Sequence, residues 1–129
     1  MSWQTYIDVS LVGSGRVDLA SIVGFEDKKI WASSPGFEVS PDEINVIVEG
    51  LKQTNLDKLR ADGFYVAGER YVLTKSEDRS LIGRKGQEGV VIVKSKMAVL
   101  IGHYNKDMIA GNCSITVEGL ADYLEKQGY

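Results

Sequence analysis

One histidine and one cysteine are the residues of this 129-residue chain best suited to acid–base or nucleophilic chemistry. His103 ends an apolar run, and the sequence around it offers neither a clear nucleophile nor an acid to orient its ring. Cys113 stands at the start of a predicted helix, where the helix dipole can lower the pKa of a thiol. We interpret both residues as structural, so the sequence predicts no catalytic residue and no enzyme.

Metal and nucleotide sites are also not expected. One cysteine and one histidine cannot fill a four-ligand zinc site without carboxylates at unsupported spacings. The segment Gly83-Arg84-Lys85-Gly86 carries glycines and bases, but it lacks the spacing of a phosphate-binding loop and joins two predicted strands. The sequence therefore predicts no metal site and no cofactor.

Five aromatic residues have a more informative placement. Trp3 and Tyr6 fall on a predicted first helix, Trp31 in a predicted strand, and Tyr123 and Tyr129 on or after a predicted last helix. Aromatic-lined grooves bind polyproline II peptides, because the rings pack on prolines while ring hydroxyls and indole N–H groups reach backbone carbonyls. From the residues alone core packing is favoured, because a tryptophan on an apolar helical stripe usually faces inward.

Basic residues gather late in the chain. Arg84 and Lys85 share one predicted turn, Lys94 and Lys96 follow one hairpin later, and Glu88 is the acid between them. Such a patch suits phosphate groups or an acidic protein surface, and a solvated hairpin is the alternative interpretation.

The composition indicates one compact domain over residues 1–129. Apolar residues make up 43% of the chain, and the charged 26% is mixed in sign with a net charge of −3, which gives no general attraction to nucleic acid or anionic membranes. A single cysteine cannot form an internal disulfide, the N-terminus lacks a signal-peptide pattern, and no apolar run approaches ~20 residues. We expect a soluble protein of a reducing cytosol.

Three helices are predicted with clear boundaries. The first begins near Ser2, a plausible N-cap, and ends at Gly13 and Gly15. The second starts at Ser40-Pro41-Asp42-Glu43, which combines a cap, a proline at the first position and a capping box, and it runs to about Gln53. The last spans about Asn112–Gln127. A short helical stretch is also expected at Asp18–Val23.

The remaining chain is typical of strands. Those expected early are Ile22–Glu26 and Lys29–Ser33, and a later meander comprises Phe64–Ala67, Arg70–Lys75, Arg79–Arg84, Val90–Val93 and Ala98–Tyr104. Strands that are apolar at every position need cover on both faces of the sheet. The expected fold is α+β, with a central antiparallel sheet of six to seven strands, the terminal helices together on one face and the middle helix on the other.

Several motifs resemble one known family along the whole chain. These are the start Met1-Ser2-Trp3-Gln4-Thr5-Tyr6-Ile7-Asp8, the strand Ile30-Trp31-Ala32-Ser33, the stretch Asp78-Arg79-Ser80 leading to Gly83-Arg84-Lys85-Gly86, and the ending Leu120-Ala121-Asp122-Tyr123-Leu124 with Gln127-Gly128-Tyr129. The family is the profilins. A serine, tryptophan and glutamine at the extreme N-terminus, together with this C-terminal helix, make the resemblance specific.

The resemblance implies an actin-monomer-binding protein of the cytoplasm and cytoskeleton that regulates actin polymerisation and binds proline-rich segments of elongation factors and phosphatidylinositol 4,5-bisphosphate. It implies exposure of the five aromatic residues, reversing the inward orientation favoured above. The residues implied for polyproline are Trp3, Tyr6, Trp31, Tyr123 and Tyr129; for actin, Arg70, Lys75, Arg84, Lys85 and Glu118; and for phosphoinositide headgroups, Arg84 and Lys85 with Lys94 and Lys96.

Two other classes of function stay open from the residues. A small-ligand-sensing α+β domain would have the same helices and antiparallel sheet and would require an internal pocket. Such a function does not explain why aromatic residues lie on both terminal helices. A small hydrolase using Cys113 and His103 requires a perturbed thiol pKa.

Overall fold

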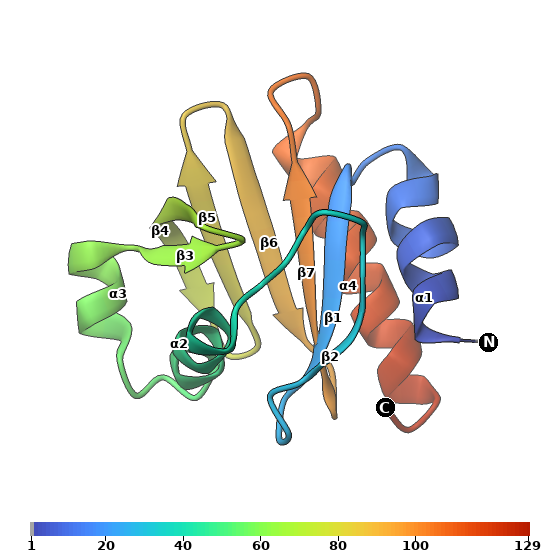
Figure 1. Ribbon diagram of the computed structural model, residues 1–129, viewed down its shortest axis with the longest axis horizontal. Coiled ribbons are helices and arrows are strands. Elements are labelled where there is room, and N and C mark those ends of the chain that lie inside the picture. The colour runs from blue at the N-terminus through green and yellow to red at the C-terminus, as the bar shows by residue number, and fades with distance from the viewer. Residues whose placement is uncertain (1) are drawn as a thin grey trace.

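A single antiparallel sheet of seven strands organises the molecule, and the computed structural model describes residues 2–129 (Figure 1). The order across the sheet is β2-β1-β7-β6-β5-β4-β3, so only the step from β1 to β7 joins strands distant in sequence. The strands are β1 (Leu19–Gly24), β2 (Ile30–Ser33), β3 (Phe64–Val66), β4 (Glu69–Glu77), β5 (Ser80–Lys85), β6 (Glu88–Lys94) and β7 (Ala98–Tyr104).

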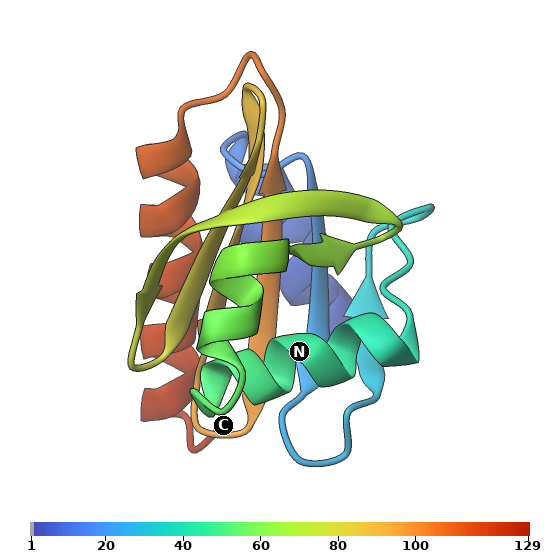
Figure 2. The same ribbon diagram turned by 90° about the vertical axis from the view of Figure 1, so that its left-hand side faces the viewer.

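The two central strands are buried on both faces. Every residue of β7 is buried, as are the five residues from Gly89 to Val93 in β6. Such strands require a layer on each side. Figure 2 shows these layers edge-on, with α4 (Ala110–Lys126) along one side of the sheet and α2 (Pro41–Leu51) across the other.

The N-terminal helix changes its winding along its length. It begins as α1 (Trp3–Thr5), continues as a π-helical segment (Tyr6–Leu11) and ends in a 3₁₀ turn (Val12–Ser14). The Ser2 side chain caps its start by accepting from the backbone N–H of Thr5. Gly15 ends it in the left-handed region at φ 77°, which favours glycine. The predicted boundaries are therefore confirmed, and Met1 of the N-terminal motif lies outside the described residues.

The terminal helices pack together on one face of the sheet, as expected. The N-terminal helix contributes Ile7 and Leu11 to this core layer, and α4 contributes Cys113, Val117, Leu120, Ala121 and Leu124. They close over strand residues such as Ala20, Ile22, Val91 and Leu100. The first and last segments of the chain are thereby fixed side by side.

The other face is covered by α2 and by a second, shorter helix, α3 (Leu56–Asp62). The predicted capping box of α2 is present: Ser40 accepts from the backbone of Glu43, and the Glu43 carboxylate accepts from the backbone of Ser40. The α2 residues Ile44, Ile47, Val48 and Leu51 are buried, and Leu59 of α3 joins them.

Two local predictions differ from the structure, and one helix was not predicted. The helical stretch expected at Asp18–Val23 is wrong, because Leu19–Gly24 is β1, whose residues from Ala20 onward are buried between the two layers. The expected strand Ile22–Glu26 accordingly begins three residues early and ends at Gly24. Helix α3 was not predicted. Its N-cap residue, Asn55, makes no side-chain capping bond, so the start of this helix lacks the interaction that marks α2. Within residues 2–129, no helix combines the length and apolar character needed to cross a membrane.

Candidate functional site

Five aromatic rings meet at one end of the paired terminal helices. The Trp3 ring centroid lies 4.8 Å from that of Trp31, 5.3 Å from Tyr129 and 5.7 Å from Tyr6. The chain of contacts continues from Tyr6 to Tyr123 at 6.3 Å. The structure therefore brings together all five residues predicted for polyproline binding, and we call them the aromatic cluster.

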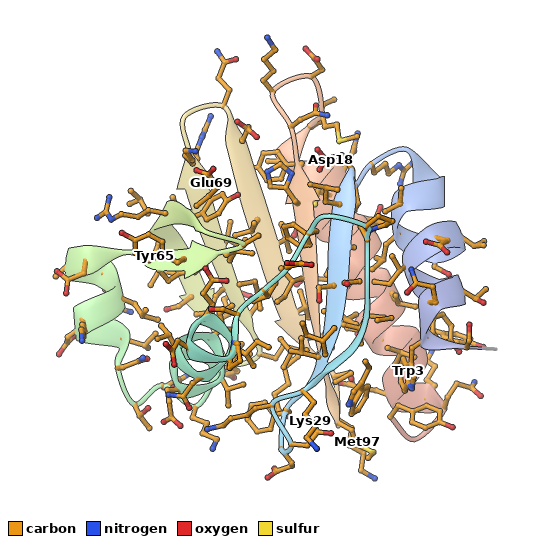
Figure 3. The ribbon with its side chains drawn as sticks, in the orientation of Figure 1. Trp3, Asp18, Lys29, Tyr65, Glu69 and Met97 are labelled. Atoms are coloured by element: carbon orange, nitrogen blue, oxygen red, sulfur yellow. The ribbon has the colours of Figure 1, made fainter. Side chains whose placement is uncertain are left out.

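The aromatic cluster remains accessible. Tyr123 and Tyr129 are 45% and 44% exposed, and the other three rings are partly buried at the margin of the core layer beneath the terminal helices. A hollow of about 320 Å³ lies among four of the rings, lined by Trp3, Tyr6, Tyr123, Gln127 and Tyr129. Figure 3 places the labelled Trp3 at the end of the molecule where the N-terminal helix begins and α4 ends.

The hollow continues between the two helices. A second depression of about 290 Å³ shares Tyr6 and Tyr123 with the first and extends past Ser10, Thr116 and Gly119. Partial burial raises the pKa of the Tyr6 hydroxyl, and the neighbouring hydroxyls of Tyr123 and Tyr129 raise it further. Tyr6 therefore presents a neutral hydroxyl beside Tyr123 at the margin of the hollow.

Local hydrogen bonds fix the two tryptophans. The indole N–H of Trp31 donates to the Asp27 carboxylate at 3.2 Å, which orients this ring from β2. The side-chain amide of Gln4 donates to the carbonyl oxygen of Ser33 at 3.1 Å and ties the first helix to the same strand. Within residues 2–129, the Trp3 indole N–H has no hydrogen-bond partner, so it is free to donate to a ligand.

The C-terminal tyrosine is fixed by its backbone. The carbonyl oxygen of Tyr129 accepts from the backbone N–H of Met97 and from the Ser95 hydroxyl, the latter at 2.8 Å. Both donors belong to the turn between β6 and β7. The sheet therefore holds the end of the chain and places the Tyr129 ring against Trp3.

The residues predicted for actin binding separate into two groups. Arg84 of β5 pairs with Val72 of β4, and Ile82 of β5 pairs with Lys75. On its other side Ile82 pairs with Val91, which belongs to the core layer under α4. Directly paired residues in antiparallel strands point to the same face, so Arg84 and Lys75 project on the α4 side. Glu118 of α4 adds to this group: the Lys75 pKa is raised chiefly by its bond to Glu77 and also by the charge of Glu118.

The other two predicted residues are engaged elsewhere. Lys85 follows Arg84 in β5, so it points to the opposite face, where it forms an ion pair with Glu69. The Arg70 guanidinium donates to the carbonyl oxygen of Asp62 at 2.7 Å, beside the start of β3. The structure thus groups Lys75, Arg84 and Glu118 but not Arg70 and Lys85.

Exposed apolar residues on the α4 side were missed by the sequence reasoning. Val72 is 50% exposed and pairs with Arg84, and Ile115 on α4 is 64% exposed. Apolar groups ringed by charges are typical of protein interfaces. Val72 stands between Tyr71 and Leu73 in the sequence, so nothing local marks it as exposed. Only the position of α4 reveals that its side chain shares a face with Ile115.

The basic residues predicted for phosphoinositides do not form one patch. Arg84 and Lys85 precede the β5–β6 turn, whereas Lys94 and Lys96 lie at the β6–β7 turn. These turns are at opposite ends of β6, which spans roughly 20 Å at the usual rise of a strand. Lys94 lies 4.5 Å from the centroid of the Phe25 ring. The two pairs are therefore separate surfaces.

His103 has acidic neighbours that the sequence did not reveal. Its Nδ1 lies 2.6 Å from the Asp18 carboxylate and its Nε2 lies 3.3 Å from that of Glu88. The acids come from distant positions and meet only because β7 lies between β1 and β6. The ring is 6% exposed and lies beside Phe37 and Tyr71.

Cys113 is fully buried, and burial raises the pKa of its thiol to about 12. It therefore lacks the lowered thiol pKa that a cysteine nucleophile requires. Among the described residues, no group of three or more histidine, cysteine, aspartate or glutamate side chains is arranged to hold a metal ion.

Comparison with known proteins agrees with the arrangement of the terminal helices and the sheet. The family model described as Profilin matches residues 1–129. The chain is 46% identical to Profilin-2 of Acanthamoeba castellanii over 129 residues, which is 100% of both chains. The crystal structure of Acanthamoeba castellanii profilin II superposes with a TM-score of 0.94 at 45% identity, covering 99% of this chain and 100% of the other.

A more distant structure shows the same fold. Mouse Profilin IIa in complex with a double repeat from the FH1 domain of mDia1 has a TM-score of 0.83 at 18% identity, with 100% of both chains covered. At that identity the likeness concerns the fold alone. The full-length family match and the 46% identity determine the assignment. This chain belongs to the profilin family.

Proposed function

We propose that this chain binds monomeric actin, proline-rich peptides and phosphatidylinositol 4,5-bisphosphate, and thereby regulates actin polymerisation in the cytoplasm and cytoskeleton. The observation that carries the proposal is the accessible aromatic cluster, which spans both terminal helices and β2. Its functions are binding equilibria, so no catalytic residue and no cofactor take part.

The aromatic cluster has the chemistry that a polyproline II helix requires. Such a helix has no internal hydrogen bonds and leaves its carbonyl oxygens free, and its proline rings are flat apolar surfaces. The Trp3 indole N–H and the Tyr6 hydroxyl supply donors, while the Trp31, Tyr123 and Tyr129 rings supply surface for packing. The distant mouse profilin, bound to an FH1 repeat, gives an independent reason to test such ligands.

The α4 side of β4 and β5 is the proposed actin surface. It combines the exposed apolar residues Val72 and Ile115 with the charges of Lys75, Arg84 and Glu118. This surface is separate from the aromatic cluster, which lies at the C-terminal end of α4. The protein is therefore able to hold an actin monomer and a proline-rich segment of an elongation factor together, and to bring that monomer to a growing filament.

Phosphoinositide binding divides between two surfaces. Arg84 belongs to the proposed actin surface, so a headgroup bound there competes with actin. Lys85 follows Arg84 in β5 and points to the other face of the sheet. Lys94 and Lys96 lie near the end of the chain and the aromatic cluster, because Tyr129 bonds to Met97 beside them. A headgroup at that turn leaves the actin surface free.

Tryptophan fluorescence during titration with poly-L-proline tests the aromatic cluster. We expect a saturable change for the wild type and its loss in Trp3→Ala, with Trp31 remaining as the reporter. Tyr65→Ala is the matched control, because Tyr65 is 51% exposed on β3, away from the cluster. An unaltered affinity in Trp3→Ala, with folding verified by circular dichroism, would remove the cluster from the proposal.

Paired charge variants separate the two lipid surfaces. Vesicles containing phosphatidylinositol 4,5-bisphosphate are sedimented with Arg84→Ala/Lys85→Ala or with Lys94→Ala/Lys96→Ala, in the presence and absence of actin. We expect only the first double variant to abolish the competition between lipid and actin. Competition that survives in it would show that the lipid does not use the Arg84 end of the sheet.

A further inference from the structure

A row of ionisable side chains crosses one end of the sheet. In the order of the strands they are Asp18, directly before β1, then His103 of β7, Glu88 of β6, Lys85 of β5 and Glu69 of β4. These five strands are consecutive neighbours in the sheet. Figure 3 labels the two outer members, Asp18 and Glu69, at the end of the sheet away from the aromatic cluster. We call the five residues the charge ladder.

Each member of the charge ladder faces the next. The Asp18 carboxylate lies 2.6 Å from Nδ1 of His103, and Nε2 of the same ring lies 3.3 Å from the Glu88 carboxylate. Glu88 stands directly opposite Lys85 in the pairing of β5 with β6, and Lys85 forms an ion pair with Glu69. Acids and bases therefore alternate along the row, provided that the imidazole is protonated.

A buried tyrosine shows that the three carboxylates act on one place. The Tyr71 ring lies 6.4 Å from the imidazole. Its pKa is raised to about 12, chiefly by burial and further by the charges of Glu88, Glu69 and Asp18. Negative charge is therefore concentrated around His103, and a proton on its ring compensates part of it.

The other sides of the imidazole bring no strong cation. Phe37 packs against it from the segment between β2 and α2, and Cys113 lies on the opposite face of the sheet, under α4. The cations nearest along the chain, Arg16 and Lys106, are exposed. Within residues 2–129, the ion pairs of Asp18 and Glu88 are formed with His103 alone.

The two contacts of His103 require two protons. Carboxylate oxygens only accept, and a neutral imidazole has a single N–H, so it can satisfy one of its two acidic neighbours. Asp18 is the neighbour that keeps this N–H, because its contact is shorter and its backbone N–H also donates to the carbonyl oxygen of His103 at 3.0 Å. The Glu88 side chain is 46% exposed, against 23% for Asp18, so water can take over its contact. Loss of the second proton thus releases Glu88.

We propose that the charge ladder is a pH-sensitive switch, in which the protonated His103 ring holds Glu88 and the neutral ring releases Glu88 toward Lys85. Imidazole is the side chain whose charge changes between about pH 5 and 8. After the release two carboxylates, Glu69 and Glu88, share Lys85, and its charge is less available to an anion. Lys85 is one of the residues considered for phosphoinositide headgroups, so this consequence rests on the proposed function, whereas the switch itself does not.

Carbon-detected NMR of the ¹³C-labelled full chain, titrated from about pH 5 to 8.5, tests the switch. We expect the Glu88 carboxyl carbon to shift with the same midpoint as the His103 ring. His103→Gln should abolish this shift, because glutamine donates an N–H at every pH. Glu26 is the control: it is exposed in the turn between β1 and β2, at the other end of the sheet, and should show no change at that midpoint.

A second variant avoids any change to the buried ring. Glu88→Gln replaces a half-exposed side chain, and poly-L-proline binding verifies that the variant is folded. Because the carboxylate beside Nε2 is lost, the midpoint of the His103 titration should move to lower pH. The proposal is overturned if the Glu88 carbon shows no change at the His103 midpoint, if the change persists in His103→Gln, or if Glu88→Gln leaves the midpoint where it was.

The consequence for anions is measured by sedimentation with vesicles containing phosphatidylinositol 4,5-bisphosphate, at about pH 6 and 7.5. The charge of the headgroup itself changes over this range and affects every variant equally. We expect the ratio of the two affinities to be about twofold larger for the wild type than for His103→Gln. Equal ratios overturn the effect on Lys85. A wild type that binds no vesicles contradicts the proposed phosphoinositide binding alone, since the NMR titration contains no lipid.

Discussion

Gly102 allows α4 to lie close to the sheet, and replacing it with alanine should separate the two. Gly102 is in β7, directly beneath the helix. A Cβ atom at this position would lie 2.6 Å from Val117 Cγ2, well inside the ordinary contact range of 3.4–4 Å. Valine in a helix has one strongly preferred rotamer, so its side chain cannot turn away at low cost. The helix must move instead.

The expected size follows from overpacking and from glycine itself. Forcing one extra carbon into a packed core costs about 1–3 kcal/mol, and removing glycine from a strand returns about 0.5–1 kcal/mol. The net loss for Gly102→Ala is therefore about 1–2 kcal/mol. For a chain of this length that lowers Tm by about 4–8 °C. Because α4 carries Tyr123, we also expect weaker binding of poly-L-proline.

A double-mutant cycle identifies the cause. Val117→Ala alone removes two buried methyl groups and should destabilise the protein by about 2 kcal/mol. In the Gly102→Ala background the same change makes room for the new methyl group, so we expect a favourable coupling of about 1 kcal/mol or more, measured by urea denaturation. Gly119→Ala is the matched control on α4: its Cβ has open space, and it should stabilise the helix by about 0.5–1 kcal/mol. Additive free energies for Gly102 and Val117, within about 0.5 kcal/mol, would refute the contact.

Three further predictions concern single side chains. Burial raises the pKa of Cys113 from 9.0 to about 12, so at pH 8 its reaction with a disulfide reagent should be at least about thirtyfold slower than that of glutathione; a comparable rate would contradict its burial. Burial also raises the pKa of Tyr71 to about 12, against about 10 in the unfolded chain. The folded state then holds a proton that the unfolded state releases, so the free energy of unfolding should fall by about 1 kcal/mol between pH 9 and 11 in urea titrations. If the difference in free energy of unfolding between wild type and Tyr71→Phe stays constant over this range, the raised Tyr71 pKa is ruled out. Glu43→Ala removes the acceptor for Ala67 and Gly68 and half of the capping box, and should lower the free energy of unfolding by about 2–3 kcal/mol; a loss below about 0.5 kcal/mol would show that water replaces these bonds.

Local chemistry made part of the fold predictable. The capping residues Ser40 and Glu43 act within four positions of each other, and both of their bonds are present. The strand Ala98–Tyr104 has the predicted limits, since Lys96 and Asn105 bound a stretch made up mostly of apolar residues. Leu19–Gly24 was predicted incorrectly because a short run that is apolar at almost every position has no periodicity that separates a helix from a buried strand. Its neighbour β7 comes from the far end of the sequence, so only the completed sheet resolves the ambiguity.

Contacts between distant parts of the chain also limited what could be predicted of the candidate sites. Arg84 and Lys94 are near in sequence, yet the strand between them places them at opposite ends of the sheet. His103 lacked visible acidic neighbours because Asp18 is 85 residues away in the chain.

The aromatic cluster shows how tertiary structure reversed a sound local argument. Trp3 follows the apolar stripe of its helix, which by itself favours burial. In the structure, Ile7 and Leu11 fill the core below the helix, whereas Trp3 lies one to two turns earlier, where the sheet is ending. Trp31 and Tyr129 stack against it there, so the ring is supported without being enclosed. A groove fixed in this way by the sheet and by both ends of the chain loses little entropy when a stiff polyproline helix binds, and this favours affinity from a small contact area.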